Sequence, residues 1–167
     1  TAADLDDEQS LEVNKYLRVL SDFERMSDHA RNIGEAVGEI NEKKIVLSDE
    51  AQKELRVLED AISEITKMTI DAFVNNDTDL ALRVDPLEEV VDDLCDKIKA
   101  HHVERMSKKE CSIENGFVFN DMLTDYERIS DHCSNIAGDV LEAVTGDMWT
   151  HEFHSKPEFR ENKLFKQ

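Results

Sequence analysis

Hydrophobic residues recur three or four positions apart in four long segments of the chain, at about 11–40, 51–74, 79–106 and 113–144. This spacing gathers them on one face of a helix and is typical of amphipathic helices. Short polar stretches join the segments, and nowhere do apolar and polar residues alternate as they do in a β-strand. The pattern therefore predicts an all-α fold, an antiparallel up-down bundle of four long helices.

Local signals mark several of the helix ends. Ser48 precedes Asp49 and Glu50, an arrangement in which a capping residue is followed by an acidic first turn. Pro86 lies one or two turns inside the third segment, where we expect a kink or a staggered start because proline lacks a backbone N–H. Gly146 suits the position just after the last helix. The residues beyond it have no clean period, and we expect an irregular tail.

The composition excludes several classes of protein. Five Gly and two Pro among 167 residues are too few for a turn-rich all-β domain. The net charge of −19 disfavours binding to nucleic acid and to anionic lipid, whereas it is compatible with binding to cations. No apolar run approaches the roughly 20 residues of a membrane span. Three cysteines without a Cys-x-x-Cys pair favour free thiols in a reducing compartment.

An internal repeat is the strongest feature of the sequence. Residues 20–33 align with residues 123–136 at an offset of 103, and nine of the fourteen positions are identical. The ionisable identities are Asp22, Glu24, Arg25, Asp28 and His29, repeated as Asp125, Glu127, Arg128, Asp131 and His132. Repeated helices usually retain their apolar spacing while surface charge drifts. The retained polar residues indicate that both helical units present the same chemistry.

Pairs of carboxylates four residues apart are the main candidate for chemistry, because this spacing stacks them on one helix face. Three pairs share it: Glu24 and Asp28, Glu88 and Asp92, and Glu127 and Asp131. Like charges at this spacing cost about 0.2–0.5 kcal/mol, so a basic side chain or a cation should compensate. Carboxylate oxygens suit Mg²⁺, Mn²⁺, Ca²⁺ or iron. A solvated acidic face and a set of metal ligands remain as alternatives.

Other residue types contribute less. His29 and His132 stand beside carboxylates, where a histidine is more often a hydrogen-bonded packing residue than a ligand of a hard cation. A di-iron oxidase in a four-helix bundle needs Glu-x-x-His motifs, and the chain has none. It also has no P-loop, Gly-x-Ser-x-Gly or His-Glu-x-x-His signature. The sequence therefore predicts a protein that is not an enzyme.

The repeated segments resemble a known family. Residues 22–33 and 125–136 are similar to the signature helix of PhoU proteins, and residues 88–94 resemble the other helix motif of that family. The resemblance extends over about residues 11–144. The segment Asp-His-Cys-Ser-Asn-Ile, 131–136, is most similar to the PhoU-like region that follows the membrane part of bacterial Na⁺/phosphate cotransporters.

The resemblance implies a fold of two three-helix repeats that hold metal clusters on the bundle surface. The implied ligands are Glu24, Asp28, Glu88, Asp92, Glu127 and Asp131, and the implied cofactor is a divalent or ferric ion: iron, Zn, Mg, Mn or Ca. This chain departs from the pattern, because residues 1–47 supply only the last helix of a first repeat, while residues 48–146 supply a complete second repeat and 147–167 form the tail. We therefore expect an N-terminal truncation, with the site of Glu24 and Asp28 either empty or completed by another copy through swapping.

The function implied by the resemblance is regulation of phosphate transport. The main expectation is the cytoplasmic, metal-binding domain of a Na⁺/phosphate cotransporter, located at the inner face of the bacterial cell membrane. The alternatives are a free-standing PhoU-type regulator of phosphate uptake and a metal-free helical interaction module. The expected partner is a membrane phosphate transporter or the chain's own upstream membrane domain, with homo-oligomer formation left open and no role for nucleic acid.

Overall fold

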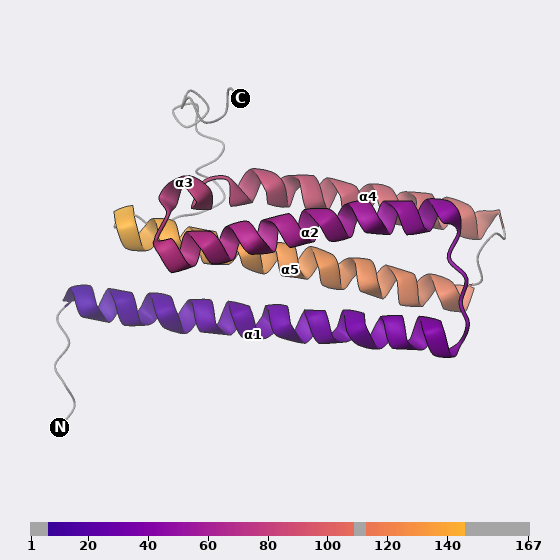
Figure 1. The fold of residues 1–167 in the computed structure, drawn as a ribbon, viewed down its shortest axis with the longest axis horizontal. Coiled ribbons are helices and arrows are strands. Elements are labelled where there is room, and N and C mark those ends of the chain that lie inside the picture. The colour runs from indigo at the N-terminus through magenta and orange to yellow at the C-terminus, as the bar shows by residue number, and fades with distance from the viewer. Residues whose placement is uncertain (1–6, 109–112, 146–167) are drawn as a thin grey trace.

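Four long helices and one short helix make up the described part of the chain (Figure 1). The computed structural model describes residues 7–108 and 113–145. The helices are α1 (Asp7–Glu42), α2 (Asp49–Asn75), α3 (Thr78–Ala81), α4 (Val84–Ser107) and α5 (Ile113–Thr145). The predicted all-α bundle is confirmed. The expected C-terminal residue Gly146 and the tail 147–167 lie outside the described residues.

Most of the core lies among α2, α4 and α5. Each of these helices presents an apolar stripe, and the stripes meet to exclude water. The largest fully buried side chains include Leu58, Ile65, Val91, Phe119, Leu123 and Ile136. The predicted cap of α2 is confirmed, because the Ser48 hydroxyl accepts a hydrogen bond from the backbone N–H of Ala51 at 3.2 Å.

The third predicted helix is divided. Asn76 has a φ of 50° and ends α2, and the Asp77 carboxylate accepts a hydrogen bond from the backbone N–H of Leu80 at 3.0 Å to begin the single turn of α3. The chain then restarts as α4 at Val84. Pro86 falls in the first turn of α4, where its missing N–H leaves no helical hydrogen bond unmade. The expectation of a staggered start is therefore met by a break ahead of the proline.

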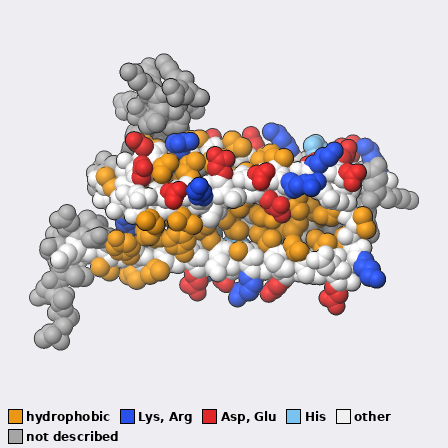
Figure 2. Space-filling model, viewed as in Figure 1, with side chains coloured by type: hydrophobic (Ala, Val, Ile, Leu, Met, Phe, Trp, Pro, Cys, Tyr) orange, Lys and Arg blue, Asp and Glu red, His pale blue; other side chains and the backbone are white. Residues whose placement is uncertain are grey.

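Helix α1 lies along one side of α5, antiparallel to it, and stands apart from α4 (Figure 1). At its N-terminal half, Tyr16 and Phe23 make edge-on contacts with the ring of Phe73, near the end of α2. Figure 2 shows hydrophobic side chains gathered in a band between α1 and α2, with charged side chains along both margins. On α1, the large hydrophobic side chains of Leu17 and Leu20 are 60% and 64% exposed.

None of the helices within residues 7–108 and 113–145 is both long and apolar enough to span a membrane.

Candidate metal centre

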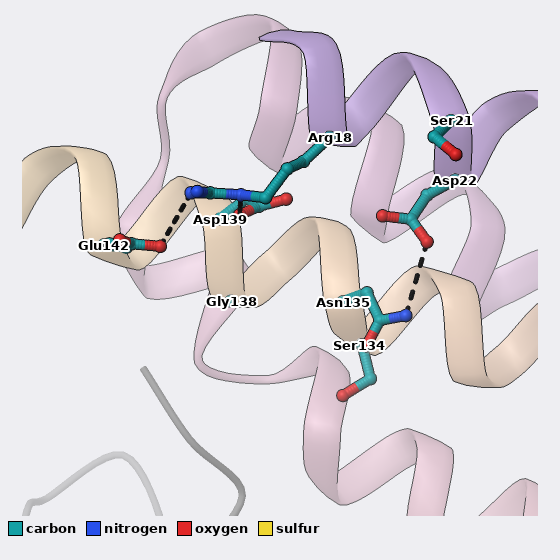
Figure 3. Close-up of a pocket in the computed structure, with 8 residues that line it drawn as sticks. All are labelled: Arg18, Ser21, Asp22, Ser134, Asn135, Gly138, Asp139 and Glu142. Atoms are coloured by element: carbon teal, nitrogen blue, oxygen red, sulfur yellow. Dashed lines mark hydrogen bonds and ion pairs between the residues drawn. The ribbon is translucent and has the colours of Figure 1, made fainter. Parts of the chain in front are cut away.

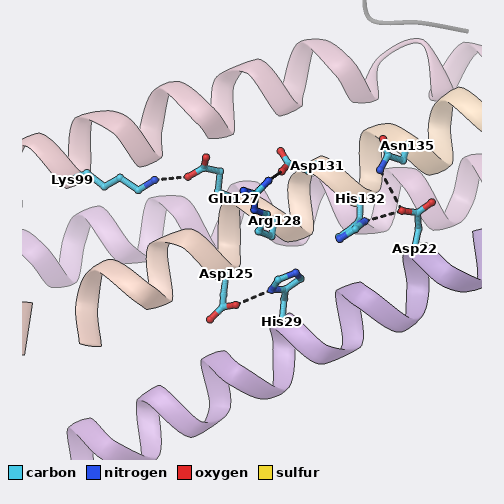
Figure 4. A network of polar contacts seen from close by, with 9 residues as sticks. All are labelled: Asp22, His29, Lys99, Asp125, Glu127, Arg128, Asp131, His132 and Asn135. Atoms are coloured by element: carbon cyan, nitrogen blue, oxygen red, sulfur yellow. Dashed lines mark hydrogen bonds and ion pairs between the residues drawn. The ribbon is translucent and has the colours of Figure 1, made fainter. Parts of the chain in front are cut away.

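The two copies of the repeat face each other across the interface of α1 and α5 (Figure 4). His29 of α1 contacts Asp125 of α5 through Nδ1 and Oδ1 at 2.7 Å. The reciprocal contact joins His132 and Asp22 through the same atoms at the same distance. Because both pairs come from equivalent positions of the repeat, α1 and α5 are related here by a local twofold axis.

Further contacts follow the same symmetry. The Asn32 amide donates to Asp125 at 3.2 Å, and the equivalent Asn135 amide donates to Asp22 at 3.3 Å. The rings of His29 and His132 stack with their centroids 5.7 Å apart. These contacts give the histidines a structural role, since each is hydrogen-bonded to a carboxylate of the facing helix, as the sequence led us to expect. Part of the repeated polar chemistry thus serves to align two helices.

The pairs His29–Asp125 and His132–Asp22 are called the crossed histidine pairs below. A groove between α1 and α5 next to them holds a separate group of ion pairs (Figure 3). The Arg18 guanidinium contacts Asp139 at 2.5 Å and Glu142 at 2.7 Å. Burial raises the pKa of the Asp139 carboxyl, and the contact with Arg18 opposes that effect. These two carboxylates therefore have a cation from the protein itself.

A second group of carboxylates lies at the interface of α4 and α5. Glu88 and Asp92 are one turn apart on α4, and Asp131 reaches them from α5. One oxygen from each of the three side chains lies within 4.8 Å of the others. Oxygen ligands of one hard cation are spaced in this way, because metal–oxygen distances of about 2.0–2.6 Å limit how far apart the ligands can be. Two of the three predicted pairs therefore contribute to one cluster.

The electrostatics of this cluster favour a cation. Burial, followed by the charges of Asp92, Asp131 and Asp85, raises the pKa of Glu88 to about 7. Burial and the nearby Asp131 charge also raise the pKa of Asp92, and its Oδ1 atom is buried without a hydrogen-bond partner among the described residues. Each feature marks negative charge that the protein compensates only in part, since the charge of Lys99 opposes the raised pKa of Asp92. The donor set, three carboxylates and no thiol or imidazole, suits a hard cation.

Glu127, the other half of the α5 pair, points to a different partner. Its carboxylate accepts a hydrogen bond from the Lys99 ammonium of α4 (Figure 4). Asp131 forms an ion pair with Arg128, one turn earlier on the same helix, at 2.9 Å. Glu127 is therefore close to the cluster but already paired, and the structure does not gather it with the three carboxylates described above.

The pair on α1 lies apart from the other predicted ligands. Glu24 is exposed, and Asp28 pairs with Arg31 on its own helix at 2.8 Å. No side chain of another helix within the described ranges completes a group of three possible ligands with them. The six predicted ligands thus fall into three situations: three gathered, one paired with lysine, and two on an open helix face.

Two residues near the cluster were not singled out from the sequence. Asp85 lies in the first turn of α4, contributes to the raised pKa of Glu88 and accepts a hydrogen bond from Ser134. Lys99 stands eleven residues after Glu88 and seven after Asp92, which is the spacing of one helix face. That spacing was a usable signal for Lys99, whereas the link of Asp85 to Ser134 depends on packing.

Comparison with known proteins adds independent information. The model of the family described as the PhoU domain matches residues 55–140, which include the cluster, all of α4 and most of α5. Over 130 residues the chain is 32% identical to a protein of Thermotoga maritima, the phosphate-specific transport system accessory protein PhoU homolog 1. Over 130 residues it is 25% identical to the phosphate-specific transport system accessory protein PhoU homolog of Clostridium acetobutylicum.

Both alignments cover 78% of this chain but only 55% and 58% of the respective relatives. The chain therefore spans a little more than half the length of the curated relatives that it matches. No solved structure gives a significant match to the chain.

Proposed function

Because the chain belongs to the PhoU family, we propose that it acts as an accessory or regulatory protein of phosphate transport. The observation that carries the proposal is the family match over residues 55–140, since that segment contains both halves of the carboxylate cluster. The relatives are named as accessory proteins of phosphate-specific transport systems. These names favour the free-standing regulator, the alternative expectation from the sequence, over the domain of a Na⁺/phosphate cotransporter.

The proposal includes a hard cation held by Glu88, Asp92 and Asp131. The raised pKa of Glu88 and the buried Asp92 oxygen support it, because a cation would compensate both. When bound, the ion supplies positive charge to an otherwise acidic face. It thereby allows that face to approach an anionic group such as phosphate or an acidic partner surface.

The proposal has three further parts. The chain binds a partner in the transport system, it is located at the inner face of the membrane, and it has no enzymatic activity. The charge of −19 supports a protein partner over direct contact with anionic lipid, because like charges repel. We propose no catalytic residue, since the chain lacks the catalytic signatures sought in its sequence.

The test is to delete the coding sequence in its native host and then to supply either the wild-type chain or a variant. Deletion is expected to alter the rate of phosphate uptake when external phosphate is abundant, measured with radiolabelled phosphate. Wild-type chain should restore normal uptake, and the Asp131→Asn variant should not. Uptake that is unchanged by deletion at both low and high phosphate would contradict a role in phosphate transport.

A further inference from the structure

Among the described residues, the carboxylates between α4 and α5 form a row, and a lysine of the facing helix donates a hydrogen bond at the Glu127 end of it. Glu88, Asp92 and Asp131 lie toward one end, and Glu127 lies one turn before Asp131 on α5. The charge of Glu127 contributes to the raised pKa of Asp92, so the two acidic groups are electrostatically close. Lys99 hydrogen-bonds Glu127 at the far end of the row, and its charge also opposes the raised pKa of Asp92.

Lys99 is held more firmly than an ordinary surface lysine. Its side chain is 27% exposed and that of Glu127 is 30% exposed, and they belong to different helices. Burial alone lowers the pKa of Lys99, but the hydrogen bond and the charge of Glu127 outweigh burial and raise the pKa overall. The ammonium therefore lies against the carboxylate that a second metal ion would need as a ligand.

Arg128 beside Asp131 differs from Lys99 in each respect. Its side chain is 57% exposed, and its contact with Asp131 is made within one helix at a spacing of three residues. Such exposed pairs contribute little and exchange readily with solvent. An ion that approaches Asp131 has only to displace a solvated arginine, whereas an ion that approaches Glu127 has to displace a lysine fixed between two helices.

We propose that Lys99 is a built-in counter-ion that occupies the Glu127 end of the row and restricts the metal centre of this chain to one ion on Glu88, Asp92 and Asp131. The inference rests on the proposed function, because it presumes that the cluster binds a cation. It assigns Lys99 a positioning role: the residue touches no metal and acts through Glu127. Without its ammonium, Glu127 becomes a free ligand one helical turn from Asp131.

The test is a titration of the full chain with Mn²⁺ alone, with bound ions counted by equilibrium dialysis and by electron paramagnetic resonance. Wild-type protein is expected to bind one Mn²⁺ per chain. Lys99→Met is expected to bind a second ion and to show the broadened signal of two neighbouring Mn²⁺ ions. Its first ion should bind about tenfold more tightly, because a unit positive charge has been removed nearby.

Two further variants separate the inference from simpler explanations. Lys97→Met removes the same charge from an exposed position of α4, and it should bind one ion as the wild type does. Lys99→Met combined with Glu127→Gln should return to one ion, because the freed carboxylate is the ligand that was gained. Circular dichroism and thermal melting confirm that each variant is folded before its ions are counted.

The outcomes distinguish this inference from the proposed function. One ion on both wild type and Lys99→Met, with equal affinity, overturns the role of Lys99 and leaves the metal centre standing. Two ions on the wild type, or a second ion on Lys97→Met, also overturn it. No Mn²⁺ on any folded variant at millimolar concentration overturns the metal centre itself, and the inference with it.

Discussion

The two copies of the repeat, one in α1 and one in α5, have nearly the same sequence and very different surroundings. Helix α5 is packed against α1, α2 and α4, whereas α1 packs mainly on α5. Equivalent leucines show the result: Leu123 of α5 is fully buried, and Leu20 of α1 is 64% exposed. Where the two copies face each other, equivalent side chains are buried to the same extent: Met26 and Ile129 are 7% and 6% exposed.

The same contrast decides the chemistry. Asp28 and Asp131 each form an ion pair with an arginine three residues away on their own helix, but of the two, within the described residues, Asp131 alone also meets the carboxylates of α4 and joins a cluster. A pair of stacked carboxylates is therefore not a site by itself in this protein. It becomes a candidate centre only where a second acidic helix lies opposite, because one helix face offers too few ligands to hold an ion.

The largest expected difference between the copies concerns burial. Leu123→Ala should lower the free energy of unfolding by about 2–5 kcal/mol, because it leaves a cavity in a packed core. Leu20→Ala should change it by less than about 0.5 kcal/mol, since this side chain is exposed. Urea denaturation of the two variants measures both. Equal losses would show that α1 has a cover in solution that the described residues do not include.

The next difference concerns the cation. Asp131→Asn should weaken Mn²⁺ binding at least tenfold, or about 1.4 kcal/mol, because the cluster loses one of its three charged ligands. Asp28→Asn makes the same change at the equivalent position of α1 and should leave the dissociation constant unaltered. Isothermal titration calorimetry compares the two. If both variants bind as the wild type does, the cluster is only a solvated acidic face.

At the crossed histidine pairs, the two copies of the repeat should contribute equally to the free energy of unfolding. His29→Gln and His132→Gln should each lower the free energy of unfolding by about 1 kcal/mol, because each removes a hydrogen bond to a carboxylate at an identical distance. Thermal unfolding at neutral pH measures the two effects. A double-mutant cycle with Asp22→Asn should show coupling to His132 and none to His29. Strongly unequal losses would contradict the local twofold symmetry.

The smallest effect concerns pH and the metal-free protein. The pKa of Glu88 rises from 4.5 to about 7 on folding, so the folded state binds a proton between these values that the unfolded state releases. Glu88 therefore has no effect on stability below about pH 4.5, its unfavourable contribution grows as the pH rises toward 7, and that contribution is complete above this pH. With a chelator present, Glu88→Gln should stabilise the protein at pH 8 relative to the wild type. The gain should be below about 1 kcal/mol because solvent screens this half-buried group.

Calorimetry at pH 5 and pH 8 gives the comparison. The advantage of Glu88→Gln should be smaller at pH 5, where the wild-type carboxyl already binds its proton in the folded state. An advantage that does not depend on pH would show that the charge of Glu88 is not its cause. Asp93→Asn is the matched control, since it removes a negative charge from an exposed position of the same helix.

Much of the fold followed from local pattern. The four long helices and the Ser48 cap are set by residues close together in sequence, so their positions were predictable. The break before α4 was harder to place, because Pro86 is compatible with both a kink and a helix start. The short α3 depends on a cap by Asp77 that competes with continuation of the helix, and periodicity alone does not resolve this competition.

By itself the sequence determined the helices, the repeat and the stacking of carboxylates four residues apart, because helical geometry fixes which residues share a face. Only the tertiary structure decided which faces meet. Lys99 and Glu127 are 28 residues apart, and Asp22 and His132 are 110 apart. No local rule links such distant positions, since their contact depends on the packing of whole helices. The sequence supplied the carboxylates, and the packing of α4 against α5 selected the three that form the candidate centre.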